Sequence, residues 1–383
     1  MTTLPLSVYV HLPWCESKCP YCDFNSHKQP ADSAAVQADY VDALVADLMQ
    51  QARWVDDRPV ETVFIGGGTP SLFPPDRIAT VLQALKDALS IRSDAEITME
   101  ANPGSLERGH YAGYRDAGVN RLSIGGQSMN DQFLKRLGRL HSANDTVRAV
   151  EQATAAGFER INVDLMYGLP EQRVEEAIAD VAAVLALGVR HVSHYQLTLE
   201  PNTQFFARPP NLPADDHIAE MMDQTASLFT AAGLSRYEIS ALATPGEACR
   251  HNLNYWRFGD YLGLGAGAHG KLTLDGVVHR YARPAHPQSF IKHADEPWSL
   301  NDQSRVSDQH LVFEFMMNAL RLTDGFDELV FEQATGLKIS AAAPSMEDAV
   351  NRRLLQCSES GIWSPTALGR RFLNDLIGIF LPG

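Results

Sequence analysis

The sequence predicts an α/β fold, with a partial (β/α)6 barrel followed by a smaller α+β C-terminal region. Three observations lead to this fold class. Short β-rich runs alternate with amphipathic helical stretches in the first half of the chain, the connections are short, and the polar and glycine motifs follow the strands. Such units imply parallel strands joined by right-handed crossovers. Six units are two short of a closed eight-stranded barrel, so we expect an open one.

The six units follow one another along the chain. We expect the strands at residues 7–12, 60–65, 96–99, 121–124, 160–166 and 191–199. We expect the helices at residues 32–54, 75–89, 105–117, 131–137, 144–156 and 171–187. In folds of this kind, ligand groups collect at the carboxyl ends of the strands.

Beyond Pro201 the alternation ends. Residues 214–232 are predicted to form a long helix and residues 236–242 a strand. The dipeptide Asp275-Gly276 predicts a tight hairpin turn between strands at 272–274 and 277–281.

From residue 301 onward, helices predominate. They are followed by a strand–turn segment at 361–365 and a last helix at 368–378, a pattern typical of a winged-helix-like tail. We therefore expect three regions: a barrel at 1–205, an α+β extension at 206–300, and a mostly helical C-terminal domain at 301–383.

The composition, with 45% hydrophobic and 21% charged residues, is that of a soluble globular protein. No apolar run reaches about 18 residues, and the first residues lack the pattern of a secretory signal, so we expect a cytoplasmic protein without a membrane span. The net charge of −15 argues against a broad surface for nucleic acid or anionic lipid. A local basic pocket and a peripheral membrane association stay open.

Three of the five cysteines lie within eight residues, as Cys15-x3-Cys19-x2-Cys22, directly after the first strand. This spacing does not resemble a disulfide framework. Three thiolates on one loop can hold three corners of a 4Fe–4S cluster, which leaves the fourth iron free to bind S-adenosylmethionine. The alternative is structural zinc with His27 or His11 as a fourth ligand, although we find no second ligand pair at zinc-site spacing.

The segments Tyr9-Val10-His11-Leu12-Pro13-Trp14-Cys15 and Cys19-Pro20-Tyr21-Cys22-Asp23-Phe24-Asn25 resemble the radical SAM superfamily. Within it, they resemble the family that includes oxygen-independent coproporphyrinogen III dehydrogenase and the heme chaperones. The resemblance runs strongly over residues 8–256 and more loosely into the tail. It implies a radical-SAM barrel, with a 4Fe–4S cluster that can cleave S-adenosylmethionine to a 5′-deoxyadenosyl radical.

The predicted strand ends carry further polar and glycine residues, each of which alone is more often a capping or surface residue. Together they recur where a shared site would form. The resemblance implies S-adenosylmethionine-binding roles for Tyr9, Gly67, Gly68, Thr69, Glu100, Gln127, Arg139 and Asp164. One departure is Gly126, where relatives often carry valine.

The segment His251-Asn252-Leu253-Asn254-Tyr255-Trp256 is a second motif. A histidine there can ligate heme iron, or line a porphyrin slot with Tyr255 and Trp256 as walls. The alternative is a buried histidine with satisfied ring nitrogens. The segment resembles the HNxxYW motif that is associated with heme binding in the heme-chaperone branch, which favours heme at His251. Cys249 is a candidate thiol partner.

Two departures distinguish the chain from the dehydrogenase of that family. Phe24 stands where the enzyme has an additional cysteine. The first predicted strand begins within ten residues of Met1, so we expect no counterpart of the N-terminal extension that contributes to the enzyme's substrate site. The resemblance therefore implies a heme chaperone that passes heme to acceptor hemoproteins, such as those of the respiratory chain. The alternative is the dehydrogenase itself, an enzyme of porphyrin biosynthesis. A third hypothesis is a zinc-stabilised binding module.

Overall fold

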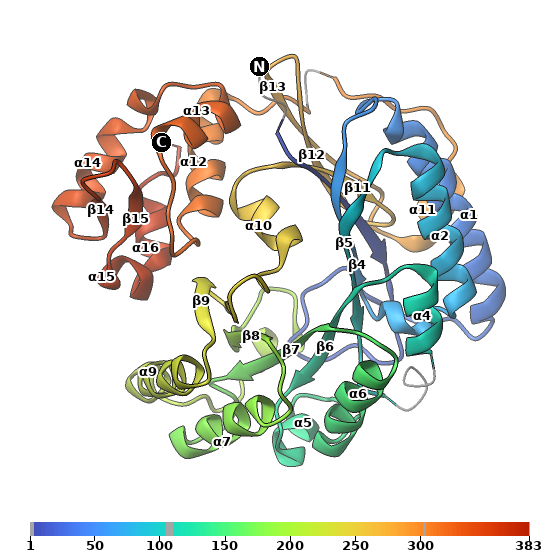
Figure 1. Cartoon of the computed structure of the whole chain (residues 1–383), viewed down its shortest axis with the longest axis horizontal. Coiled ribbons are helices and arrows are strands. Elements are labelled where there is room, and N and C mark those ends of the chain that lie inside the picture. Colours follow the sequence, from blue (N-terminus) through green and yellow to red (C-terminus); the bar gives the residue numbers. More distant parts are fainter. Residues whose placement is uncertain (1–3, 105–109, 302–303, 383) are drawn as a thin grey trace.

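The computed structural model describes residues 4–104, 110–301 and 304–382. One eleven-stranded sheet organises the chain, in the order β13-β12-β11-β1-β4-β5-β6-β7-β8-β10-β9 (Figure 1). Six central strands are parallel, which confirms the predicted partial barrel. They are β1 (Leu6–Leu12), β4 (Val60–Gly67), β5 (Ile91–Ala101), β6 (Arg121–Gln127), β7 (Arg160–Tyr167) and β8 (His191–Gln196).

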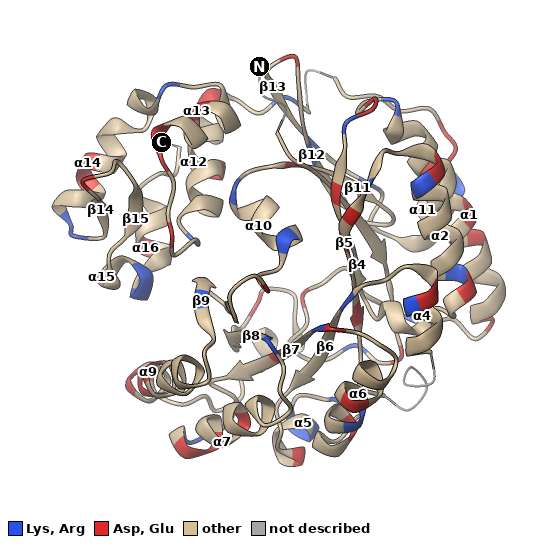
Figure 2. Cartoon of the chain, viewed as in Figure 1, with Lys and Arg blue, Asp and Glu red and all other residues tan. Residues whose placement is uncertain are grey.

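Helices cover the outer face of these strands (Figure 1). They are α1 (Ser33–Ala52), α2 (Pro75–Ala88), α4 (Tyr111–Ala117), α5 (Asp131–Arg136), α6 (Ala143–Ala155) and α7 (Val174–Leu185). The helix predicted at 105–117 is found from Tyr111 onward, and residues 105–109 lie outside the described residues. Figure 2 shows acidic and basic residues interspersed over these outer helices.

The strands alternate between an apolar outer face and a polar inner face. Val8, Val63 and Val163 belong to the large apolar core shared with the helices. Polar neighbours on these strands contact one another inside the barrel: Thr62 donates to Ser7 at 2.8 Å, and Asn162 Oδ1 lies 2.7 Å from His191 Nδ1. The period of two in a strand thus gives the barrel a polar interior, in which ligands or buried hydrogen-bond networks can be held.

Residues 206–300 add strands to both edges of this sheet. β11 (Asp260–Leu264) pairs in parallel with β1, and β12 (His269–Leu274) and β13 (Val277–Ala282) continue it as the predicted hairpin. Asp275 and Gly276 have φ of 50° and 80°, as a two-residue hairpin turn with two positive φ angles requires.

The single strand predicted at 236–242 is wrong. The chain instead forms two antiparallel strands, β9 (Ser235–Glu238) and β10 (Ala241–Ala243), beside β8. The Glu238 carboxylate accepts a hydrogen bond from the Ser240 N–H at 3.0 Å, which stabilises the reversal between the strands.

The other helices of residues 201–300 lie around and inside the barrel. They are α8 (Gln204–Ala207), α9 (Asp215–Ala231), α10 (Arg250–Trp256) and α11 (Pro287–His293). α10 lies within the ring of strands and contacts β1 and β4 (Figure 1). It carries the predicted HNxxYW segment into the barrel interior.

The C-terminal residues form a second apolar core around Phe315, Phe331 and Leu376. Its elements are α12 (Asp308–Ala319), α13 (Glu328–Thr335), α14 (Ala343–Asn351), β14 (Leu355–Cys357), β15 (Trp363–Pro365), α15 (Ala367–Arg371) and α16 (Leu373–Gly378). The single helix predicted at 368–378 is wrong, because Phe372 leaves helical geometry and α16 turns to bury Leu376.

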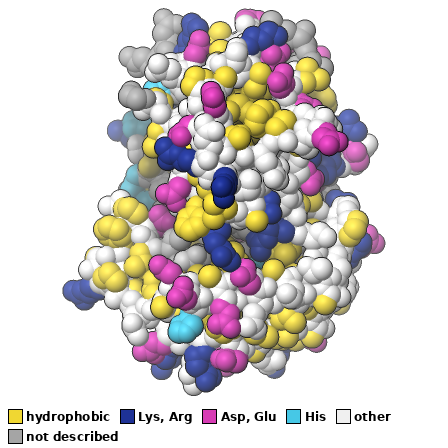
Figure 3. Space-filling view, turned by 90° about the vertical axis from the view of Figure 1, so that its left-hand side faces the viewer, with side chains coloured by type: hydrophobic (Ala, Val, Ile, Leu, Met, Phe, Trp, Pro, Cys, Tyr) yellow, Lys and Arg dark blue, Asp and Glu magenta, His cyan; other side chains and the backbone are white. Residues whose placement is uncertain are grey.

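Figure 3 shows the face formed by this C-terminal part and α9, where hydrophobic and basic side chains gather between the two.

Among the helices within the described ranges, none has both the length and the apolar character that crossing a bilayer requires.

Candidate functional site

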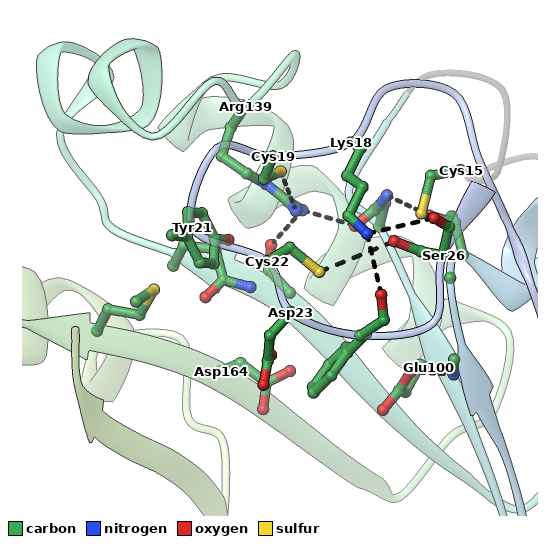
Figure 4. A pocket seen from close by; sticks show the side chains of 18 of the residues that line it. Cys15, Lys18, Cys19, Tyr21, Cys22, Asp23, Ser26, Glu100, Arg139 and Asp164 are labelled. Atoms are coloured by element: carbon green, nitrogen blue, oxygen red, sulfur yellow. Dashed lines mark hydrogen bonds between the residues drawn. The ribbon is translucent and has the colours of Figure 1, made fainter. Parts of the chain in front are cut away.

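The three clustered cysteines lie on the loop that leaves β1. Two short parallel strands, β2 (Trp14–Cys15) and β3 (His27–Lys28), close this loop. Inside it, the Lys18 ammonium donates to the carbonyls of Phe24 and Ser26 at 3.1 and 3.4 Å. All three thiols line one cavity of about 410 Å³ at the carboxyl ends of the barrel strands (Figure 4).

Each thiol has a polar side chain as a neighbour. Thr69 Oγ1 donates to Cys15 Sγ at 3.5 Å, Arg139 Nη1 donates to Cys19 Sγ at 3.6 Å, and Ser26 Oγ lies 3.9 Å from Cys22 Sγ. Burial raises the pKa of the Cys15 and Cys22 thiols. These thiols are therefore protonated near neutral pH, and binding of iron would release their protons.

The loop fits a cluster better than a single zinc ion. Across the described ranges, no three Cys, His, Asp or Glu side chains converge as a group that could hold one metal ion. His11 uses both ring nitrogens, on Tyr9 Oη at 3.0 Å and on the Asn25 carbonyl at 2.9 Å, and His27 Nε2 lies 3.1 Å from Asn25 Oδ1. Separate thiols on one loop suit a cluster in which each thiolate binds its own iron.

The glycine motif at the end of β4 forms the wall beside the cysteine loop. Gly67 has φ of 120°, and a Cβ there would lie 2.7 Å from the His11 ring. A Cβ at Gly68 would lie 2.6 Å from the Trp14 carbonyl oxygen. Only glycine allows β4 to approach the loop this closely. The backbone of Gly67 and Gly68 thereby forms part of the cavity wall.

Two carboxylates, Glu100 and Asp164, face the cavity below the cysteine loop (Figure 4). Glu100 Oε2 accepts from the Gly67 N–H at 3.1 Å, and Asp164 accepts from Asn162 Nδ2 at 2.7 Å. Burial, together with the negative charge of Asp164, raises the pKa of Glu100 to about 8. Burial also raises the pKa of Asp164. Such a pair favours a cationic ligand, which would stabilise the ionised carboxylates.

Asn102 connects the donors that contact the thiols. Its Nδ2 donates to Thr69 Oγ1 at 3.1 Å, and its Oδ1 accepts from Arg139 Nη2 at 2.6 Å. Arg139 Nε is buried and has no hydrogen-bond partner among the residues that the structure describes. Buried donors normally have a hydrogen-bond partner, so this N–H is available to donate to a polar ligand in the cavity.

Gln127 ends β6 with φ of 66° and accepts from the Tyr195 hydroxyl at 2.7 Å. Both residues line the cavity. A Cβ at Gly126 would lie 3.1 Å from Thr146 Cγ2 and from Val163 Cγ1. Gly126 does not line the cavity, so having glycine here, where relatives often carry valine, does not change the residues of the cavity wall.

Most of the residues that were predicted to bind S-adenosylmethionine line this one cavity. They are Gly67, Gly68, Thr69, Glu100, Gln127, Arg139 and Asp164. Tyr9 does not line it: its hydroxyl lies against His11 and its ring stacks on Phe64. The sequence reasoning missed Asn102, Tyr195 and Lys18, although Asn102 and Tyr195 follow the same rule of strand ends.

His251 lies apart from this cavity, on α10 inside the barrel. The residue is 1% exposed, and its ring stacks on Phe64 with centroids 5.1 Å apart. Thr62 Oγ1 lies 2.8 Å from Nδ1 and Tyr255 Oη lies 2.9 Å from Nε2, so both ring nitrogens have partners. Burial lowers the pKa of His251 to about 3, which keeps the ring neutral. Cys249 Sγ is likewise buried and donates to Glu96 at 3.5 Å.

The chain is similar to known proteins over nearly all of its length. It matches the radical SAM superfamily over residues 9–183 and the HemN C-terminal domain over residues 306–372. It is 45% identical over 379 residues to the heme chaperone HemW of Escherichia coli strain K12, which covers 98% of both chains. It is 43% identical over 382 residues to the heme chaperone HemW of Haemophilus influenzae, again with 98% of both chains covered.

Among solved structures, the chain resembles coproporphyrinogen III oxidase (HemN) from Escherichia coli, which is described as a radical SAM enzyme. The TM-score is 0.81 at 22% identity, with 99% of this chain and 90% of the other covered. At that identity, the likeness establishes a shared fold.

Proposed function

Because the chain belongs to the radical SAM superfamily and, within it, to the HemW family of heme chaperones, we propose that it binds heme and transfers it to acceptor hemoproteins. The observation that carries the proposal is the similarity to heme chaperones over 98% of both chains. We also propose that the barrel holds a 4Fe–4S cluster and S-adenosylmethionine, and that the protein acts in the cytoplasm.

The cavity geometry supports the cluster and S-adenosylmethionine. Cys15, Cys19 and Cys22 would hold three irons, with Thr69, Arg139 and Ser26 placed to donate to the thiolates. When bound, the two groups supply one-electron reductive cleavage of a sulfonium. The protein would orient the ligand through the backbone at Gly67 and Gly68 and through the carboxylates of Glu100 and Asp164.

The proposed transfer function requires heme to be bound in an exchangeable way. The resemblance of the HNxxYW segment favours His251 as a heme ligand. On the same helix, α10, Tyr255 and Trp256 line a second cavity. For His251 itself to ligate iron, its bond to Thr62 or to Tyr255 would have to break and the barrel interior would have to open. Acceptors in the respiratory chain remain part of the proposal.

A second candidate function is oxygen-independent coproporphyrinogen III dehydrogenase. The observation that favours it is the cavity at the barrel mouth, which brings the three thiols and the polar residues of the strand ends together in a fold shared with HemN. Against it, Phe24 takes the place of a further cysteine, and its side chain is 58% exposed on the cysteine loop. No thiol is therefore available at that position.

One experiment separates the two functions. The cluster is reconstituted without oxygen and confirmed by iron and sulfide content, and the sample is divided. One part receives reductant, S-adenosylmethionine and coproporphyrinogen III, and protoporphyrinogen is followed by chromatography. The other is loaded with heme and mixed with the apo form of a respiratory-chain hemoprotein.

We expect no protoporphyrinogen, and heme transfer that is faster than from serum albumin carrying the same heme. Steady turnover of coproporphyrinogen III would instead establish the dehydrogenase. Failure of the wild type to bind heme would refute the chaperone proposal.

A further inference from the structure

A second cavity, of about 580 Å³, lies between α10, α12 and the β11–β13 strands. We propose that heme binds in this cleft with its iron ligated by His310 of α12, and that His251 positions the cleft wall without ligating iron. The inference rests on the proposed heme-chaperone function and assigns that function a site.

The cleft has the apolar and aromatic lining that a flat apolar macrocycle needs. α10 contributes Tyr255 and Trp256, β11 contributes Tyr261, and α12 contributes Phe313 and Met317. The Tyr255 and Tyr261 rings meet edge to face with centroids 4.5 Å apart. A volume of this size lies within the range of pockets that hold cofactors, which are lined mostly by apolar and aromatic side chains.

The charged residues of the cleft are already paired. Arg280 contacts Glu314 at 2.7 Å and donates to the Tyr261 hydroxyl at 2.6 Å, while Lys271 contacts Asp260 at 2.9 Å. An apolar ring placed on this surface would therefore not cover an unpaired charge.

His310 has the arrangement expected of an iron ligand. Its Nδ1 lies 2.7 Å from Ser307 Oγ, which orients the ring. The side chain is exposed, and no described residue forms a hydrogen bond with Nε2. Ser307 is the N-cap residue of α12, yet its hydroxyl makes no capping bond to the helix. The hydroxyl is thus used for the histidine, as outer partners orient metal-binding histidines in general. Histidine is a common axial ligand of heme iron.

The HNxxYW segment supplies Tyr255 and Trp256 to the wall of the same cleft, whereas His251 does not line it. His251 Nε2 lies 2.9 Å from the Tyr255 hydroxyl, and Thr62 fixes the opposite side of the ring at 2.8 Å. The motif thus holds Tyr255 and Trp256 at the wall, while its histidine stays 1% exposed. This accounts for a link between the motif and heme without requiring His251 to reach iron.

The test is titration of the full-length protein with ferric heme, followed by the Soret band and by electron paramagnetic resonance. The variants are His310→Ala, His251→Asn and, as a matched control, His217→Ala, whose exposed histidine lies on α9 away from the cleft. For His310→Ala we expect loss of the histidine-ligated signature and a dissociation constant raised by about tenfold or more. Added imidazole should restore the signature, because it replaces the missing ligand.

For His251→Asn we expect weaker binding with the histidine signature retained, and His217→Ala should behave as wild type. The site assignment is overturned if His310→Ala keeps the wild-type signature and affinity, or if His251→Asn alone loses the signature and regains it with imidazole. In either case, heme binding by the wild type would leave the chaperone function standing. A wild type that binds no heme would overturn both.

Discussion

The carboxylates of Glu100 on β5 and Asp164 on β7 face the same cavity, and the charge of Asp164 helps to keep Glu100 protonated at neutral pH. Burial is the larger cause, and together the two effects raise the pKa of Glu100 to about 8. This pair lies below the three thiols and is therefore placed to respond to the charge of whatever binds beside the cluster.

The first prediction is that S-adenosylmethionine binding depends on pH through Glu100. With a pKa of about 8, Glu100 is protonated below that pH, and a sulfonium cation nearby favours the ionised form. Binding at pH 7 should therefore release a proton, and affinity should rise as the pH approaches 8 and then level off. Calorimetry of the reconstituted protein in two buffers of different ionisation enthalpy measures the proton count. Glu100→Gln should abolish the release. An unchanged proton count in this variant would assign the titration to another group.

The second prediction concerns Gly67, which combines a positive φ with a close contact. In Gly67→Ala, the new Cβ would meet the His11 ring at 2.7 Å, in addition to the strain at φ of 120°. Gly157 is the matched control, since it has φ of 88° and no atom of the described residues lies within 4 Å of its would-be Cβ.

We expect Gly157→Ala to lower the free energy of unfolding by about 1–2 kcal/mol. Gly67→Ala should cost about 1–3 kcal/mol more, because overpacking adds to the strain. Urea unfolding of the protein without cluster gives both values. Equal losses in the two variants would mean that the His11 ring moves aside freely.

The sequence predicted the central part of the fold because that part depends on local patterns. Alternating strands and helices made the six parallel units visible, and the rule of strand ends brought Gly67, Glu100 and Asp164 to one cavity. The reversal at Ser240 was missed because it depends on one side-chain hydrogen bond within a β-rich run. The pairing of β11 with β1 links residues more than 250 apart in the chain, for which local patterns carry no signal.

The site was predicted less completely than the fold. Tyr9 was predicted by resemblance to bind S-adenosylmethionine; its hydroxyl lies against His11, and Tyr9 is not among the residues that line the cavity. Asn102 was passed over, although its amide joins Thr69 to Arg139. Strand twist and β-bulges decide whether a side chain at a strand end faces the cavity or points away from it. One such irregularity is the register shift before Gln127. Twist and bulges depend on how the whole sheet packs, so local sequence patterns do not predict them.

The third prediction concerns the buried pair Lys271 and Asp260, whose side chains are 1% and 0% exposed. Asp260→Asn would leave the Lys271 ammonium buried without its counter-charge. Removing one partner of a buried ion pair typically costs about 3–5 kcal/mol, so we expect a loss of that size in urea unfolding. The double variant Asp260→Asn/Lys271→Met should recover much of it. If the double variant is no more stable than Asp260→Asn, then the loss comes from the other partners of Asp260, which include Arg58 at 2.9 Å.

The last prediction is that Asn102 holds the surroundings of the cluster in place. Asn102→Ala would free Thr69 and Arg139, which donate to Cys15 and Cys19, from the amide that joins them. Loss of such an outer partner typically costs about 10- to 100-fold in metal affinity. We therefore expect the reconstituted variant to lose iron to a chelator faster than wild type, measured without oxygen by the decay of cluster absorbance. Asn144→Ala, at an exposed position on α6, is the control and should lose iron at the wild-type rate. If Asn102→Ala also retains iron at that rate, Thr69 and Arg139 keep their positions without the amide.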